Sequence, residues 1–129
     1  MFTLFLLPWV VLGQVGPAPL VIIQPGSALV WDPVSLDING DPEEISYYTV
    51  IATPVTVTVP DIGSTLRTTD VPVANIGLDG FMSGLPAAAY NLFTRAVDTA
   101  ANESAWSVPL ASRWDRAVPQ TPVGLSISP

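Results

Sequence analysis

The stretch that decides the fold is Tyr90–Ser107, YNLFTRAVDTAANESAWS. Its first eight residues alternate in the manner of a strand, which places every second side chain on the same face. One face would carry Tyr90, Leu92, Thr94 and Ala96, and the other Asn91, Phe93, Arg95 and Val97. Polar, turn-forming residues fill 98–104, and a second short strand is expected from Ala105. The stretch therefore predicts two neighbouring strands joined by a polar loop.

The composition favours one all-β domain. The chain has 129 residues, which is the usual length of one domain and is enough to form a sizeable core. Hydrophobic residues make up 49% and charged residues 12%, which excludes the low-hydrophobicity kind of disorder. Prolines and glycines divide the chain into short segments, and none of these shows a clear helical stripe of useful length.

The charge balance argues against nucleic acid as a partner. Eleven acidic residues stand against four arginines, with no lysine or histidine, and the net charge is −7. Binding to a phosphate backbone needs clustered cations, which this sequence lacks. An anionic membrane surface is disfavoured on the same grounds.

The sequence also lacks the residue types that most catalytic and metal sites need. Without cysteine it has neither a disulfide nor a thiolate, and without histidine it lacks the usual general base and the commonest zinc ligand. Its serines have no histidine or lysine to activate them. Its acidic residues lie in predicted loops of a fold whose interior is filled by side chains. We expect no enzymatic activity, no catalytic residue and no cofactor.

Two acidic loops have the composition of ligand sites. The segment 37–44, DINGDPEE, begins with oxygen-bearing side chains at alternate positions, as a calcium loop does. The match fails later, because Tyr48 stands where the bidentate glutamate should be. The second group contains Asp98, Asn102 and Glu103, and such side chains commonly bond their own backbone in turns. Both loops are predicted to be turns, with no metal bound.

The N-terminal segment leaves two interpretations open. Residues 1–13, MFTLFLLPWVVLG, are apolar but fewer than the roughly 20 residues that a membrane-spanning helix needs. They are either the core of a secretory signal, with the small residues Gly16 and Ala18 nearby, or a retained apolar arm on residues 1–18 that docks on another subunit. The contacts of such an arm would come from Phe2, Leu4, Phe5, Leu6, Leu7 and Trp9.

Short apolar runs separated by turns predict strands along the rest of the chain. Val55–Val59, VTVTV, is typical of an edge strand because it alternates cleanly and is followed by a proline. In chain order, the expected strand regions are 19–26, 27–35, 45–52, 55–59, one within 61–80, 90–97 and 106–111.

These segments resemble a fibronectin type III domain over about residues 19–111. Tyr90–Ser107 is similar to the family's F strand, F–G loop and G strand, and Tyr48-x-Val50 is similar to its strand C. Leu85–Tyr90 looks like the family's turn in which a corner tyrosine bonds back to the backbone. The resemblance implies a seven-stranded antiparallel sandwich of fibronectin type III or immunoglobulin-like type on residues 19–112, with an arm at each end. Its core would contain Trp31, Tyr48, Val50, Tyr90, Leu92 and Ala96.

Residues 113–129 are expected to form a C-terminal tail. The last twelve, VPQTPVGLSISP, resemble the linker and first strand that open a following fibronectin type III module. The domain therefore either belongs to a longer array or carries an arm that pairs with a neighbour's sheet. Leu125 and Ile127 are the candidate contacts of such an arm.

An aromatic and cationic group near the last strand has two interpretations. It consists of Trp106, Arg113 and Trp114, with Arg116 nearby. Tryptophan and arginine anchor many protein interfaces, so the group is a candidate contact patch. Arginine stacked on tryptophan is equally a way of covering the end of a sandwich from within the same chain.

The sequence thus favours a non-enzymatic structural or interaction protein. Contacts with other protein subunits through the two arms would make it a homo-oligomer or part of a hetero-assembly. The first expectation is a component of a phage virion, such as a capsid decoration, cement or tail protein. The alternative is a secreted or cell-surface bacterial module for adhesion or spacing, which requires residues 1–13 to be a signal. A carbohydrate-binding accessory would need a row of exposed aromatics from Tyr47, Trp106 and Trp114.

Overall fold

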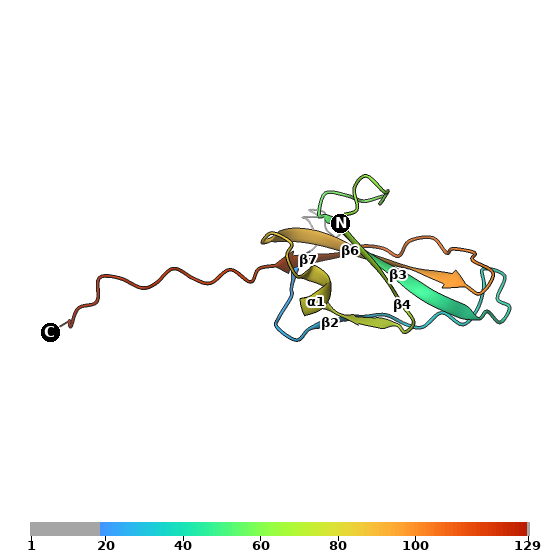
Figure 1. Ribbon diagram of the computed structural model, residues 1–129, viewed down its shortest axis with the longest axis horizontal. Coiled ribbons are helices and arrows are strands. Elements are labelled where there is room, and N and C mark those ends of the chain that lie inside the picture. The colour runs from blue at the N-terminus through green and yellow to red at the C-terminus, as the bar shows by residue number, and fades with distance from the viewer. Residues whose placement is uncertain (1–18, 129) are drawn as a thin grey trace, which may run out of the picture.

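Two β-sheets and one short helix form the part of the chain that the computed structural model describes, residues 19–128 (Figure 1). The larger sheet has the strand order β1-β7-β6-β3-β4, and β2 pairs with β5 in a second sheet. The predicted all-β class is confirmed. In chain order the elements are β1 (Val21–Ile22), β2 (Ala28–Val30), β3 (Ile45–Pro54), β4 (Arg67–Val71), β5 (Asn75–Gly77), α1 (Leu78–Met82), β6 (Ala88–Asp98) and β7 (Leu110–Trp114).

The long antiparallel pair of β3 and β6 forms the centre of the larger sheet. Regular pairing runs from Tyr47 opposite Val97 to Pro54 opposite Tyr90. β-branched and aromatic residues, which fit a pleated surface well, are frequent in both strands. A register shift next to Ile45 ends the regular pairing at the start of β3. Every other strand of the larger sheet attaches to this pair directly or through β7.

The hydrophobic core lies between the two sheets. Leu29 from β2, Val50 from β3 and Leu92 from β6 are buried there, and α1 adds Phe81 and Met82. Burying one such side chain contributes roughly 1.5–3 kcal/mol, so the helix and the small sheet are held mainly by this contact. Of the residues expected in the core, Trp31 is half-buried against it, and the buried ones are Tyr48, Val50, Tyr90, Leu92 and Ala96.

The outer face of the larger sheet is also covered. Ile51 and Phe93 alternate with the core residues of their strands, yet they are only 3% and 1% exposed. The loop after β3 passes over this face in Figure 1, drawn in green. It is held by Nδ2 of Asn91, which donates to the carbonyl oxygens of Val55 (3.1 Å) and Val57 (2.8 Å). Burial on both faces explains why β6 carries apolar residues on both sides of its alternation.

The prediction of an entirely antiparallel sandwich is wrong at the first strand, because β1 runs parallel to β7. The N–H of Ile23 donates to the carbonyl of Arg113 (3.0 Å), and the buried Ile23 side chain packs into the core beside β7. The chain then crosses to the smaller sheet through the turn at Pro25 and Gly26. Gly26 has a φ of +82°, a conformation that glycine adopts without strain.

The predicted edge strand at Val55–Val59 is also wrong. This segment forms a turn and a loop, because its carbonyls accept hydrogen bonds from the Asn91 side chain instead of a neighbouring strand. The edge strand beside β3 is β4, which lies later in the chain. One strand was expected within 61–80, and the structure has two there, β4 and β5.

Helix α1 was not expected from the sequence. Its buried residues, Leu78, Phe81 and Met82, are spaced so that they share one face. The guanidinium of Arg67 holds its C-terminal end by donating to the carbonyls of Phe81 and Ser83. A five-residue helix has too little periodicity to be recognised in a sequence, and tertiary contacts form it.

Two buried tyrosines fix the chain at the ends of the core. The Tyr90 hydroxyl donates to the carbonyl of Pro86, which is the corner bond expected before β6. The Tyr48 hydroxyl accepts from the N–H of Val34 at 2.9 Å, and its ring packs edge-on against Trp31 with centroids 5.3 Å apart. Both phenol groups are therefore satisfied inside the fold.

We predict that Tyr90→Phe lowers the free energy of unfolding by about 1 kcal/mol, because it removes the corner hydrogen bond and leaves the ring in place. The measurement is urea denaturation followed by tryptophan fluorescence. Tyr47→Phe, at a half-buried tyrosine on the other face of β3, is the matched control and should change stability less. Equal effects of the two variants would contradict the role assigned to the corner.

Candidate functional site

The predicted contact residues fall into three groups. The apolar residues at positions 2–9 lie outside the described part of the chain. Within residues 19–128, no helix has the length and apolar character that crossing a membrane requires. Trp106, Arg113 and Trp114 belong to the body of the domain, whereas Leu125 and Ile127 project from it.

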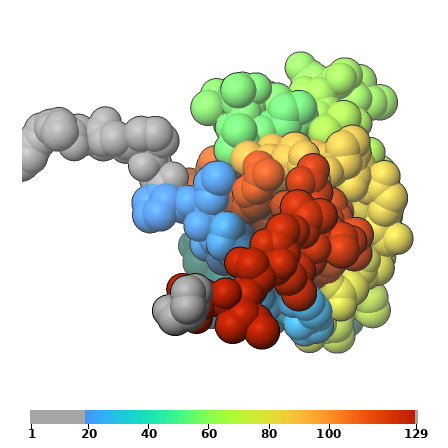
Figure 2. Space-filling model, turned by 90° about the vertical axis from the view of Figure 1, so that its left-hand side faces the viewer, coloured from blue at the N-terminus to red at the C-terminus, as the bar shows by residue number. Residues whose placement is uncertain are grey.

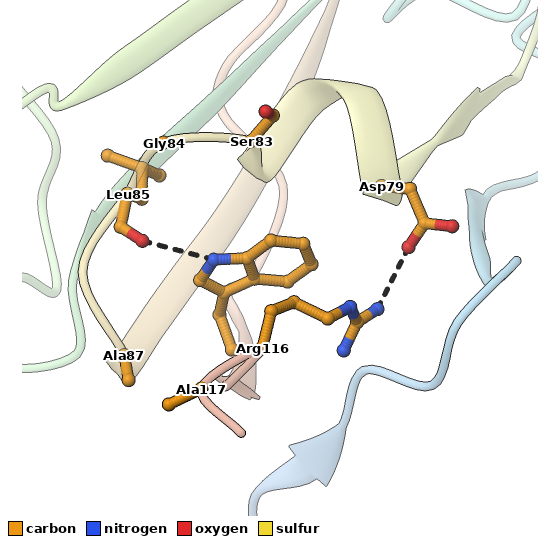
Figure 3. A pocket seen from close by; sticks show the side chains of 8 residues that line it. Asp79, Ser83, Gly84, Leu85, Ala87, Arg116 and Ala117 are labelled. Atoms are coloured by element: carbon orange, nitrogen blue, oxygen red, sulfur yellow. Dashed lines mark hydrogen bonds and ion pairs between the residues drawn. The ribbon is translucent and has the colours of Figure 1, made fainter.

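Trp114 lies in the core and is unavailable as an interface residue. It is 5% exposed, and its indole Nε1 donates to the carbonyl of Leu85 at 3.1 Å (Figure 3). The guanidinium of Arg116 stacks over the ring at 4.3 Å from its centroid. The structure therefore agrees with the second interpretation of this tryptophan, in which it covers the end of the sandwich from within the same chain.

Arg116 fastens three parts of the chain at this end of the domain. Its Nη1 donates to the carbonyl of Ile23 at 2.8 Å, and its Nη2 pairs with Oδ1 of Asp79 at 2.8 Å (Figure 3). Asp79 also accepts from the N–H of Gly26 at 2.8 Å. The Arg116 side chain, followed by the Gly26 N–H, holds the pKa of Asp79 below its usual value. The folded body thus continues past the boundary predicted at 112, and the free tail starts after Arg116.

A shallow hollow of about 400 Å³ lies beside this cluster. Three of its polar side chains already have hydrogen-bond partners. The Trp114 indole donates to Leu85, Arg116 pairs with Asp79, and Asp79 also accepts from the N–H of Gly26. The hollow is therefore a by-product of the structural cluster. Its lining consists of Asp79, Ser83, Gly84, Leu85, Ala87, Trp114, Arg116 and Ala117.

Trp106 lies apart from Trp114 and has a different arginine partner. It is half-buried, and the guanidinium of Arg95 stacks 4.3 Å from its ring centroid. Arg95 also pairs with Glu103 at 2.9 Å. Arg113, the arginine predicted to join the patch, lies on β7, where it is half-buried opposite Ala89 of β6. Because Trp114 is in the core, the aromatic row that a carbohydrate-binding surface would need does not form.

The two acidic loops form backbone turns. Oδ1 of Asp37 accepts from the N–H groups of Asn39 (2.8 Å) and Asp41 (3.0 Å). Oδ1 of Asp98 likewise accepts from the N–H groups of Ala100 (2.9 Å) and Asn102 (2.8 Å). These are the local bonds that Asp makes in turns. Among residues 19–128, no group of three or more potential metal-binding side chains is clustered.

The carboxyl groups of Glu43 and Asp98 have pKa values shifted in opposite directions. Burial raises the pKa of Glu43, and the negative charge of Asp98 raises it further. Hydrogen bonds from the Asn102 side chain and backbone hold the pKa of Asp98 below its usual value. At neutral pH the pair is therefore a small electrostatic cost that the loop contacts must offset.

The C-terminal tail is the most conspicuous exposed feature. Residues 117–128 extend away from the body in Figure 1 and are exposed throughout. The tail carries no charged residue from Ala117 onward. Its apolar side chains are almost fully open to solvent, with Val118 at 87%, Val123 at 89%, Leu125 at 87% and Ile127 at 95%. These uncovered apolar side chains make the tail a candidate interaction segment.

Comparison of the chain with known protein families, curated proteins and solved structures finds no match. The resemblance to fibronectin type III domains thus rests on the sequence motifs. The geometry adds an exposed, uncharged tail on a domain with buried aromatic residues. This tail, together with the open edges of the sheets, is the best candidate for a functional site in the described residues.

We predict that Trp114→Ala lowers the free energy of unfolding by about 3–5 kcal/mol, as expected for removing a buried tryptophan. Trp106→Ala removes the same atoms from a half-buried position and should cost clearly less. Urea denaturation of both variants, followed by circular dichroism, makes the comparison. A loss for Trp106→Ala as large as that for Trp114→Ala would contradict the assignment of Trp114 alone to the core.

We predict that Glu43→Gln is more stable than the wild type at pH 7. The raised pKa of Glu43 means that its favourable contribution is present at low pH and is lost as the pH rises through the folded-state pKa. The advantage of the variant should therefore shrink as the pH falls through the raised folded-state pKa of Glu43 and be lost once the pH is below the ordinary glutamate pKa of about 4.3. Urea midpoints at pH 7 and pH 3.5 test this, with the exposed neighbour Glu44→Gln as control. A pH-independent difference would rule out the electrostatic cause.

Proposed function

We propose that this protein is a non-enzymatic structural subunit that connects protein subunits in a larger assembly. The observation that carries the proposal is the exposed tail, in which Val118, Val123, Leu125 and Ile127 present apolar surface with no cover from the described residues. Uncharged apolar surface of this kind gains free energy when a partner covers it, at about 25 cal/mol per Å². The folded body then acts as a rigid base for the connector.

We further propose that the body is a fibronectin type III module. Support comes from the Tyr90 corner bond to Pro86 and from the packing of Trp31 against Tyr48. The arrangement of a four-stranded antiparallel unit, β7-β6-β3-β4, opposite the β2–β5 pair is also compatible with that fold. The parallel pairing of β1 with β7 is a local departure from an all-antiparallel sandwich.

Within this class we favour a component of a phage virion, such as a capsid decoration, cement or tail protein. Fibronectin-like modules are common in such particles, and a small subunit with apolar ends suits a repetitive shell. The alternative, a secreted or cell-surface module, is favoured only by the signal-like composition of residues 1–13. The intact mass of the native protein separates the two. Retention of residues 1–13 supports the virion subunit, and their loss supports export.

We predict that the full chain self-associates at micromolar concentration and that deleting residues 118–129 abolishes this association. Because the deleted residues lie beyond the last contact of Arg116 with the body, the urea midpoint should be unchanged when both chains are measured at a concentration low enough for them to be monomeric. Sedimentation equilibrium measures the association. Leu125→Ser with Ile127→Ser should weaken it strongly, whereas the polar control Gln120→Ser with Thr121→Ser should not. A chain that stays monomeric, or one that associates equally without the tail, would contradict the proposed function.

A further inference from the structure

The outer edge of β2 has unpaired backbone groups. At one end of the β2–β5 pair, the N–H of Leu78 donates to the carbonyl of Ser27 (2.9 Å). At the other end, the N–H of Trp31 donates to the carbonyl of Ala74 (3.2 Å). Bonded and non-bonded residues alternate along an antiparallel pair, so the N–H and C=O groups of the intervening Ala28 and Val30 point away from β5.

Nothing in the described residues covers or guards this edge. No hydrogen bond from residues 19–128 outside the β2–β5 pair reaches the backbone of Ala28 or Val30. The strand sequence Ala-Leu-Val has no charge and no proline, the usual devices that keep an edge from pairing. The Val30 side chain is 67% exposed. The edge is therefore chemically ready to accept another strand.

The other edges are less suitable acceptors. The β4 edge carries Arg67 and Asp70, and charged side chains oppose the addition of a strand. β1 is only two residues long. The outward residues of β5 are Asn75 and Gly77, which offer no apolar side chain to a partner. Among the strands of residues 19–128, β2 thus combines an unguarded edge with apolar side chains.

The tail contains a segment that matches this edge. Leu125–Ile127 equals β2 in length, and its alternation places Leu125 and Ile127 on one face, where both are exposed. Gly124 has a φ of +74°, so regular strand geometry can only begin after it. The segment has no charge that an apolar acceptor would have to bury. Length, alternation and neutrality make it a suitable added strand.

The position and stiffness of the tail favour a second copy of the chain as the acceptor. Pro119 and Pro122 hold the linker in an extended form, which opposes folding back onto the tail's own β2. Arg116 anchors the root of the tail against Ile23, next to the turn that leads into β2. Figure 2 looks onto this end of the body, with the C-terminal tail, in red, projecting toward the viewer in front of the rest. Because tail root and acceptor edge share one end, a two-fold axis allows both tails to be exchanged.

We propose that the segment around Leu125–Ile127 of one copy adds as a strand to the outer edge of β2, at Ala28 and Val30, in a second copy. The exchange is reciprocal and produces a two-fold symmetric dimer. This inference rests on the proposed function, in which the tail connects subunits, and it identifies the acceptor. New backbone hydrogen bonds would supply affinity, and contacts of the tail's apolar side chains would set the register.

Cysteine cross-linking tests the proposed contact, because the natural chain has no cysteine. Equal amounts of the Val30→Cys chain and the isotope-labelled Leu125→Cys chain are mixed under mild oxidation. Mixed disulfides are identified by mass spectrometry. We expect this pair, or Val30→Cys with Ile127→Cys, to cross-link at least tenfold faster than Thr68→Cys on the β4 edge with the same tail variant. Equal rates would overturn the proposed acceptor, and so would a disulfide closing within a monomer that carries both substitutions.

A charge placed on the edge gives an independent test. Val30→Lys should weaken self-association at least tenfold, because the charge would face the incoming strand. Val73→Lys, at a 55% exposed valine outside β2, changes the net charge equally and should leave association unchanged. Urea midpoints check that both variants fold. If Val30→Lys associates normally while tail deletion abolishes association, the β2 edge is excluded but the connecting role of the tail stands. If tail deletion has no effect, the proposed function fails as well.

Discussion

The pairing of β3 with β6 is the interaction on which the rest of the structure depends. These are the longest strands, and both of their faces are buried: Val50 and Leu92 face the small sheet and the helix, while Ile51 and Phe93 face the covering loop. A strand pair covered on both sides excludes water from its hydrogen bonds and resists opening. The short strands β1, β2 and β5 gain their stability by docking on this pair through the core.

The way in which the fold uses its apolar side chains limits where the molecule can interact. Its aromatic residues are used internally: Trp114 fills the core, Trp106 is stacked by Arg95, and Tyr48 and Tyr90 bond to the backbone. Exposed apolar side chains remain in the tail, on the short strands β1 and β2, and in loops of the body, where Ile38, Val59, Ile62 and Val108 are at least 79% exposed. Because Arg116 and its partners fix the root of the tail, the tail leaves the body from a defined point. A connector with a fixed root loses less conformational entropy on binding than a flexible one, which favours specific assembly.

Local patterns in the sequence predicted only part of this structure. The alternation in Tyr90–Val97 and the corner tyrosine concern residues close in the chain, and both lead to the observed β6. The fate of Trp114 depends on Leu85, 29 positions away, and so no local pattern distinguishes its burial from exposure. The same holds for β1, whose partner lies at the far end of the domain. Val55–Val59 alternates like a strand, but the Asn91 side chain takes the carbonyls that a strand partner would need. The exposure of the tail was predictable because prolines and the absence of charge are local features, whereas its contacts with a partner stay a prediction.

The dependence of the fold on the β3–β6 pair is tested most directly by native-state hydrogen exchange resolved by residue. We predict that amides in the middle of β3 and β6, such as those of Val50, Ala52 and Leu92, exchange only through global unfolding. Their opening free energy should equal the free energy of unfolding from urea denaturation, while amides of β2 and β5 open at lower cost. If instead the amides at the centre of β3 and β6 exchange through a local opening with a lower free energy than those of β2 and β5, the rest of the structure does not depend on the β3–β6 pair.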